Sequence, residues 1–406
     1  MSDEKPPTHR DTSYEGPPNK SGEPAPLPPV TDTFLLQLRD IVKEEFAVSY
    51  AYIDARDNMP IFVITEDEKM KARSARLTER LRPHNLLAVV RRVELFEGTG
   101  ERSTVIKLVP GPPPRRASNY AINLALFIVT VITVLWAGWS FAQSPALFYI
   151  YANFLHLTYD PVIVMVEYSV AILAIVGLHE FGHIVASRLH HVEASLPYFI
   201  PGIYYGTFGA LIVQRSPPPT RDSLFDLGLT GPLVGFVISL VVVFFGMLLS
   251  PILSSTQYSE LTAYLVTINV DITPLPLPLL FDWIWSLMTL GIPANYTALV
   301  HPVAYAGYVG FLITGLNYFP IGQLDGGHVA RALFGQKYHR VVSLIGVVIL
   351  FFFGYWLMAL LAFFLFSGRH PGPVDDVSPL SAGRKIVGVL SWLIPVLVLP
   401  PSLSYF

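Results

Sequence analysis

The sequence predicts a polytopic α-helical membrane protein, with about six transmembrane helices and a small N-terminal α/β soluble domain. Of the 406 residues, 52% are hydrophobic and only 14% are charged, whereas soluble globular proteins carry about 25% charged residues. Beyond residue 118 the apolar residues gather in runs of about 20, the length that a helix needs to cross a bilayer. The segment before residue 110 instead shows short helical and strand patterns.

Six apolar runs are predicted to cross the membrane. They cover roughly residues 119–141, 161–187, 224–250, 300–320, 341–366 and 385–402. The stretch 275–292 is also apolar, but Pro274, Pro276 and Pro278 interrupt it. We interpret this stretch as an outer-surface or re-entrant segment, with a seventh span as the alternative.

The region before the first run divides into a tail, a domain and a linker. Residues 1–30 are polar and proline-rich and lack the apolar core of a signal peptide, so we expect an uncleaved, disordered tail. Residues 31–110 are expected to fold as a cytoplasmic α/β domain. Its predicted elements are helices at 33–46 and 66–80 and strands at 48–53, 61–64, 86–95 and 104–109. Residues 111–118 then link this domain to the membrane domain, 119–406.

Lys and Arg residues predict which side of the cell membrane each segment faces. They occur before the first run and in 188–223 and 321–340, whereas 142–159 and 251–299 contain none. Six spans would therefore place the N-terminal domain and both basic segments in the cytoplasm. Three basic residues fall on the opposite side in this scheme and argue against it at the last span: Arg369, Arg384 and Lys385.

The composition also limits the metal ligands and the partners that the chain could have. The chain has no cysteine, which excludes disulfides, thiolate metal ligands and cysteine nucleophiles. A metal site must therefore use His, Asp or Glu. The net charge of −3 gives no reason to expect a nucleic-acid partner.

An HExxH motif, His179 to His183, lies near the end of the second run. Residues four apart share a face of a helix, so both imidazoles can bind one metal ion. Glu180 between them can accept a proton from an attacking water. HExxH also occurs by chance in soluble helices. Two histidines and a glutamate are costly inside a membrane span, however, and ionisable residues in such a span usually indicate a functional site.

Catalytic zinc usually has three protein ligands and one open position, so a third ligand must come from elsewhere. Asp325 is the best candidate, because Pro320 interrupts the fourth run and the glycines around Asp325 permit an irregular backbone. Such a backbone could turn a carboxylate toward the second run. The alternative for an Asp followed by Gly is an ordinary cap or turn. We expect one Zn²⁺ per chain, held by His179, His183 and Asp325.

The two motifs together resemble the site-2 protease family of intramembrane zinc metalloproteases. That family combines HExxH on one span with NxxPxxxLDG on a later one. Asn317, Pro320, Leu324, Asp325 and Gly326 match the second pattern in place. The segment 231–235 (GPLVG) also looks like the family, and the N-terminal domain is similar to that of the archaeal and chloroplast branch.

This resemblance, which covers roughly 119–366, implies a function and a role for each residue. The substrates would be transmembrane proteins, cleaved within or near the lipid bilayer in regulated intramembrane proteolysis. His179, His183 and Asp325 would bind zinc, and Glu180 would be the catalytic base. Asn317 would position the substrate or stabilise the developing oxyanion.

Two other functions fit parts of the sequence. A non-hydrolytic zinc-binding scaffold or transporter needs metal ligands but not Glu180, and the inverted repeat that many transporters show is not visible. A soluble-type zinc protease on a membrane anchor would carry HExxH outside the membrane, whereas here the motif lies inside a span.

Three further features carry expectations of their own. Residues 206–213 have strand composition and would either accept a substrate by strand addition or form a hairpin that covers the core. Gly231 and Gly235 are expected to let two helices pack closely. His328, three residues after Asp325, is expected to be a solvated loop histidine, with support of the metal ligands as the alternative.

Overall fold

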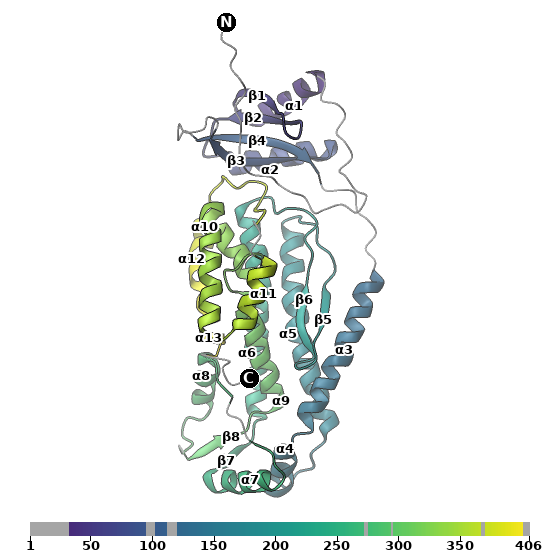
Figure 1. Cartoon of the computed structure of the whole chain (residues 1–406), viewed down its shortest axis with the longest axis vertical. Helices are drawn as coiled ribbons and strands as arrows, with labels where there is room; N and C mark the ends of the chain where they lie inside the picture. Colours follow the sequence, from purple (N-terminus) through teal and green to yellow (C-terminus); the bar gives the residue numbers. More distant parts are fainter. Residues whose placement is uncertain are drawn as a thin grey trace.

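The computed structural model of the chain describes residues 32–94, 102–111, 120–271, 275–293, 295–366 and 370–400. A small domain with a sheet lies at one end of an elongated bundle of helices (Figure 1). The predicted tail at 1–30, and the predicted linker apart from Gly111, lie outside the described residues.

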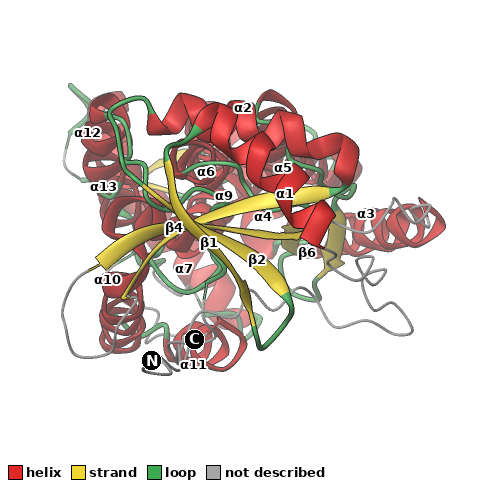
Figure 2. Ribbon diagram, turned by 90° about the horizontal axis from the view of Figure 1, so that it is seen from above, coloured by secondary structure: helices red, strands yellow, loops and turns green. Residues whose placement is uncertain are grey.

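The N-terminal domain is a four-stranded antiparallel sheet that packs against two helices. Its elements are α1 (Asp32–Glu45), β1 (Val48–Asp54), β2 (Met59–Ile64), α2 (Met70–Leu81), β3 (Leu86–Glu94) and β4 (Arg102–Pro110), with strand order β1-β2-β4-β3. Figure 2 looks down on this domain, with α1 and α2 beside the strands. Leu38 of α1 and Leu77 of α2 pack with Phe62 and Ile106 of the sheet. The predicted elements are confirmed, except that α2 begins at Met70.

Among the described residues, four helices are long and apolar enough to cross a membrane: α3 (Tyr120–Ala142), α5 (Pro161–Leu189), α6 (Arg221–Leu248) and α10 (Asp325–Phe352). They establish a mostly helical membrane protein, but they do not confirm the count of about six spans. The other helices are shorter: α4 (Pro145–Ile150), α7 (Ser255–Thr267), α8 (Leu279–Met288), α9 (Pro302–Asn317), α11 (Trp356–Phe366), α12 (Ala382–Ser391) and α13 (Leu393–Val398). Two hairpins complete the described elements: β5 (Tyr198–Pro201) with β6 (Thr207–Leu211), and β7 (Ile252–Ser254) with β8 (Tyr296–Ala298).

Helix α9 corresponds to the predicted span at 300–320 but has only 16 residues. It packs against α5 and α6, and Tyr308, Val309 and Phe311 are almost fully buried. Its central position brings its C-terminal end, at Asn317, to the HExxH segment of α5.

The predicted span at 341–366 is wrong, because this run is a helical hairpin. α10 ends at Phe352, and Gly354 adopts φ +85°. The N–H of Tyr355 then donates to the carbonyl of Leu350 (3.0 Å), and that of Gly354 to the carbonyl of Phe351 (3.2 Å). This glycine cap satisfies the last carbonyls and redirects the chain, so α11 packs back onto α10. Hydropathy could not reveal the turn, since the residues on both sides of Gly354 are aromatic.

Helix α10 is also kinked at Gly335, which has φ +71° and ψ −178°. Beyond the kink the helix lies beside the segment before Asp325, where the N–H of Gly322 donates to Ser343 Oγ (3.1 Å). Gly335 itself lies against Arg221, the first residue of α6. The kink therefore lies near the end of the bundle that faces the N-terminal domain.

Residues 370–381, which we call the strap, connect the N-terminal domain to the helical bundle. The N–H of Val90 in β3 donates to the carbonyl of Val374 (2.9 Å). On the other side, the N–H groups of Val374 and Asp375 donate to the carbonyls of Pro218 (2.8 Å) and Pro219 (2.9 Å). The strap thus lies as a strand-like segment between β3 and the start of α6.

The strap changes the expected position of the last basic residues. Arg384 follows it directly and binds Asp226 of α6 (2.7 Å). Arg384 and Lys385 therefore lie at the same end of the bundle as the N-terminal domain, not opposite it as six simple spans required. Both residues lie in α12, and the short helices α12 and α13 replace the predicted span at 385–402.

Candidate metal centre

Helix α5 carries the HExxH motif in the interior of the bundle. The helix begins at Pro161, where the Asp160 carboxylate accepts the N–H of Val162 (2.8 Å) and caps the N-terminus. Almost five turns later, His179 and Glu180 are each only 4% exposed. Burial of these polar groups is costly, and another helix supplies a partner for the His179 imidazole.

Asp325 is the first residue of α10 and lies next to both histidines. Its Oδ2 is 3.3 Å from His179 Nε2 and 3.3 Å from His183 Nε2, and the two Nε2 atoms are 3.2 Å apart. The sequence interpretation of Asp325 as a neighbour of the HExxH histidines is thus consistent with the structure, which identifies these three residues as a group that could hold a metal ion.

The donor triangle has the size that zinc requires. A tetrahedral zinc site with bonds of about 2.0 Å has ligand-to-ligand distances of about 3.3 Å. His183 Nδ1 lies 2.8 Å from the carbonyl of Leu227 and donates to it. The Nε2 atom of a neutral His183 then carries a lone pair, which faces His179 Nε2 and Asp325 Oδ2. A metal cation between these atoms would bind all three donors, and an imidazole fixed through its other nitrogen is typical of metal ligands.

Two glycines of α6 make room for the two imidazoles. A Cβ on Gly231 would lie 2.1 Å from His183 Nε2, and one on Gly235 would lie 2.7 Å from His179 Nδ1. The sequence analysis expected these glycines to allow close helix packing, and α5 and α6 do pack together. The steric role beside the metal ligands was missed, because spacing within one helix does not show what lies opposite.

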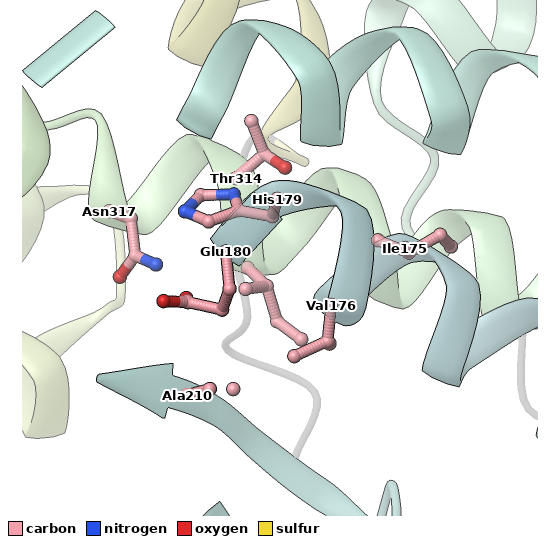
Figure 3. A pocket seen from close by; sticks show the side chains of 9 residues that line it. Ile175, Val176, His179, Glu180, Ala210, Thr314 and Asn317 are labelled. Atoms are coloured by element: carbon pink, nitrogen blue, oxygen red, sulfur yellow. The ribbon is translucent and has the colours of Figure 1, made fainter. Parts of the chain in front are cut away.

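Glu180 and Asn317 line the same small cleft. Figure 3 shows the Glu180 carboxylate and the Asn317 amide directed into this space, from α5 and α9. Val176, Ile313 and Thr314 also line the cleft. The candidate base therefore faces a confined apolar space beside the histidines, where a peptide bond could be held.

Strand β6 borders the same cleft. Gly209 and Ala210 are among its lining residues, and Figure 3 shows β6 passing below Glu180. In its two-stranded sheet β6 pairs only with β5. The segment predicted at 206–213 is thus a strand of a hairpin and lies beside the candidate base. Substrate binding by this strand stays a prediction.

The other histidines have separate partners. His328 lies within α10 and its Nδ1 is 2.8 Å from Nε2 of His370 in the strap, so the prediction of a solvated loop residue was wrong. The α10 helix begins at Asp325 and includes His328, where a loop was expected. His190 binds Asp226 (2.7 Å), and His301 caps α9 by accepting the N–H of Val303.

These features define a class of site: HExxH and an aspartate on membrane helices, arranged as in intramembrane zinc metallopeptidases. Residues 167–361 match the family model described as peptidase family M50. The resemblance to site-2 proteases is thereby confirmed.

Curated relatives agree with this assignment. The chain is 28% identical over 326 residues to "Probable zinc metalloprotease EGY1, chloroplastic" of Oryza sativa subsp. japonica, covering 72% of this chain and 52% of the relative. The protein of the same name from Arabidopsis thaliana is 30% identical over 243 residues, covering 57% and 43%. This chain therefore spans about half the length of these relatives, or less. No solved structure matches it significantly.

Proposed function

We propose that this chain is an intramembrane zinc metalloprotease that hydrolyses peptide bonds of transmembrane protein substrates. One observation carries the proposal: His179, His183 and Asp325 converge at zinc-ligand distances while Glu180 lies beside them, facing the same cleft as Asn317. A match to a peptidase family and relatives named as zinc metalloproteases support it.

The residues divide the chemistry between them. Zinc, when bound by His179, His183 and Asp325, would supply Lewis-acid polarisation of the scissile carbonyl and the attacking water. Glu180 accepts a proton from that water and returns it to the nitrogen of the leaving amine. Its position inside an apolar cleft excludes bulk water from the proton transfer.

Asn317 would act on the substrate. Its side-chain amide lies in the cleft with Glu180, where the amide N–H can donate to the developing oxyanion or hold the substrate backbone. Either role would require Asn317 to stay at the end of α9, where the helix stops before Pro320.

Strand β6 supports a way to present the substrate. A transmembrane helix must unwind before its carbonyls can reach a metal centre, and an unwound segment can pair with an edge strand. Cleavage-inactive protein with Ala210→Cys should form a disulfide with a substrate cysteine near the scissile bond, whereas Ser259→Cys in α7 should not. Equal cross-linking at both positions would exclude strand addition at β6.

We further propose that the N-terminal domain and the strap face the cytoplasm at the cell membrane. Arg and Lys residues gather at this end of the bundle, and 251–299 at the other end has none. Helix α9 and the α12–α13 pair would join the four long helices as membrane segments, giving about six. We also propose that residues 31–110 form the N-terminal domain and that residues 119–406 form the membrane domain.

The alternative of a non-hydrolytic zinc scaffold or transporter is not favoured. Such a protein has no use for a carboxylate beside the ligands, whereas Glu180 is directed into the cleft (Figure 3). The family match to peptidases points the same way.

The test compares wild type with Glu180→Gln, which keeps the shape of the side chain but removes proton transfer. General acid–base catalysis contributes about 10²–10⁴-fold in rate, so cleavage of transmembrane substrates in detergent should fall at least that far while zinc content is unchanged. Glu167→Gln, more than three turns away on α5, is the matched control and should cleave as wild type does. Equal rates for Glu180→Gln and wild type would refute the proposed base.

A further inference from the structure

Thr314 of α9 has a buried hydroxyl that makes no hydrogen bond. The residue is 0% exposed, and its Oγ1 has no partner among the described residues. Serine and threonine on helices usually donate to the carbonyl of the preceding turn, as Ser250 and Thr262 do in this chain. Thr314 does not, so its hydroxyl has another orientation. An unsatisfied buried hydroxyl destabilises the folded state, so its position requires an explanation.

His179 lacks the partner that its neighbour has. A metal-bound histidine almost always donates its second ring N–H to an acceptor, which fixes the tautomer and the ring orientation. His183 has the carbonyl of Leu227 for this purpose. Within the described part of the chain, no hydrogen bond is formed by His179 Nδ1, although its Nε2 faces Asp325.

Both unsatisfied atoms border the same position on α6. A Cβ on Gly235 would lie 2.7 Å from His179 Nδ1 and 3.1 Å from Thr314 Oγ1. Because Gly235 has no side chain, α6 places no Cβ against either group at this position. Figure 3 shows Thr314 directly beside the His179 ring, on the side away from Glu180.

We propose that the Thr314 hydroxyl accepts a hydrogen bond from His179 Nδ1–H and so holds this imidazole for metal binding. Thr314 is then a positioning residue that acts through His179, and Gly235 provides the space for the contact. The inference rests on the metal site of the proposed function, but not on peptide hydrolysis.

The test measures zinc retention rather than activity. Purified full-length protein in detergent is loaded with zinc and titrated with a chelator. Thr314→Val replaces the hydroxyl by a methyl group of nearly the same size. Loss of such a supporting hydrogen bond typically weakens metal affinity about 10–100-fold, and we expect a weakening in this range. Thr314→Ser keeps the hydroxyl and should retain zinc nearly as wild type does.

Ser239→Ala is the matched control. Ser239 lies one turn beyond Gly235 on α6, and its Oγ is also buried without a partner. It lies against Gly310 and Ile175, away from the histidines. Removal of this hydroxyl should leave zinc affinity unchanged, which separates a specific effect at His179 from a general effect of losing a buried hydroxyl.

Three results would overturn the inference. Thr314→Val could hold zinc as tightly as wild type, or Thr314→Ser could lose zinc as readily as Thr314→Val, which would indicate a packing role for the methyl group. A raised KM with unchanged zinc affinity in Thr314→Val would instead indicate contact with the substrate. If wild type binds zinc but cleaves no substrate, the proposed function fails while the comparison of zinc affinities still decides the role of Thr314.

Discussion

Arg331 and Asp376 form a bidentate ion pair in the interior of the protein, with Nη1 to Oδ1 at 3.0 Å and Nη2 to Oδ2 at 2.7 Å. Arg331 is 1% exposed and lies on α10, less than two turns after Asp325. Asp376 belongs to the strap, and its N–H donates to the carbonyl of Val90 in β3 (3.4 Å). Burial alone would raise the pKa of Asp376, but the Arg331 guanidinium outweighs it and holds the pKa below its usual range. One ion pair thus connects the helix that begins with Asp325 to the strap that binds the N-terminal domain.

Asp376→Ala should destabilise the protein strongly. Removing one partner of a buried ion pair costs about 3–5 kcal/mol, because the other charge remains buried. Glu66→Ala is the control, since the Glu66–Arg92 pair of the N-terminal domain is exposed and such pairs contribute about 0–1 kcal/mol. Thermal unfolding in detergent measures both. Similar losses of stability in the two variants would contradict a structural role for the buried pair.

Asp325→Ala should remove most of the bound zinc. Wild type is expected to hold about one zinc ion per chain, and two histidines alone leave a catalytic-type site one ligand short. Metal analysis of purified protein gives the zinc content directly. Asp282→Ala, an exposed aspartate of α8, should leave the content unchanged. Full zinc content in Asp325→Ala would exclude Asp325 as a ligand.

Gly231→Ala should displace the His183 ring and reduce zinc binding as severely as loss of a ligand. The added Cβ would lie 2.1 Å from His183 Nε2, which no side chain tolerates. Gly177→Ala on α5 is the control, because a Cβ there meets nothing within 4 Å. That change should retain zinc and stabilise the helix by up to about 1 kcal/mol. Retained zinc in Gly231→Ala would show that α6 can move away from His183.

Cysteine labelling can test the position of the strap, because the native chain has no cysteine. Ser103→Cys in β4 and Ala382→Cys at the start of α12 should react with a membrane-impermeant reagent only after the cells are opened. Ser259→Cys in α7 should react in intact cells. Labelling of Ala382→Cys, but not Ser103→Cys, from outside would favour a single span at 341–366 over the hairpin.

Local patterns predicted much of the fold. In the N-terminal domain, period-two and helical spacing were sufficient, because each element buries one face against a single sheet. The long apolar helices α3, α5 and α6 were also predicted, since hydropathy reports burial in lipid. Hydropathy failed at Gly354, where the chain turns without any loss of hydrophobicity. At α9 it located the helix but not its length, which is 16 residues.

The sequence by itself determined the chemistry of the candidate site. The HExxH spacing places His179 and His183 on one helical face. Asp325 was the best candidate for the third ligand, because the chain has no cysteine and this aspartate follows a helix break among glycines. Only the tertiary structure decided how these groups meet. The pairing of α6 with α5 brings Gly231 and Gly235 against the imidazoles, and α9 brings Thr314 to His179. Such contacts join residues far apart in the chain, and they depend on the packing of several helices at once, which no local pattern encodes.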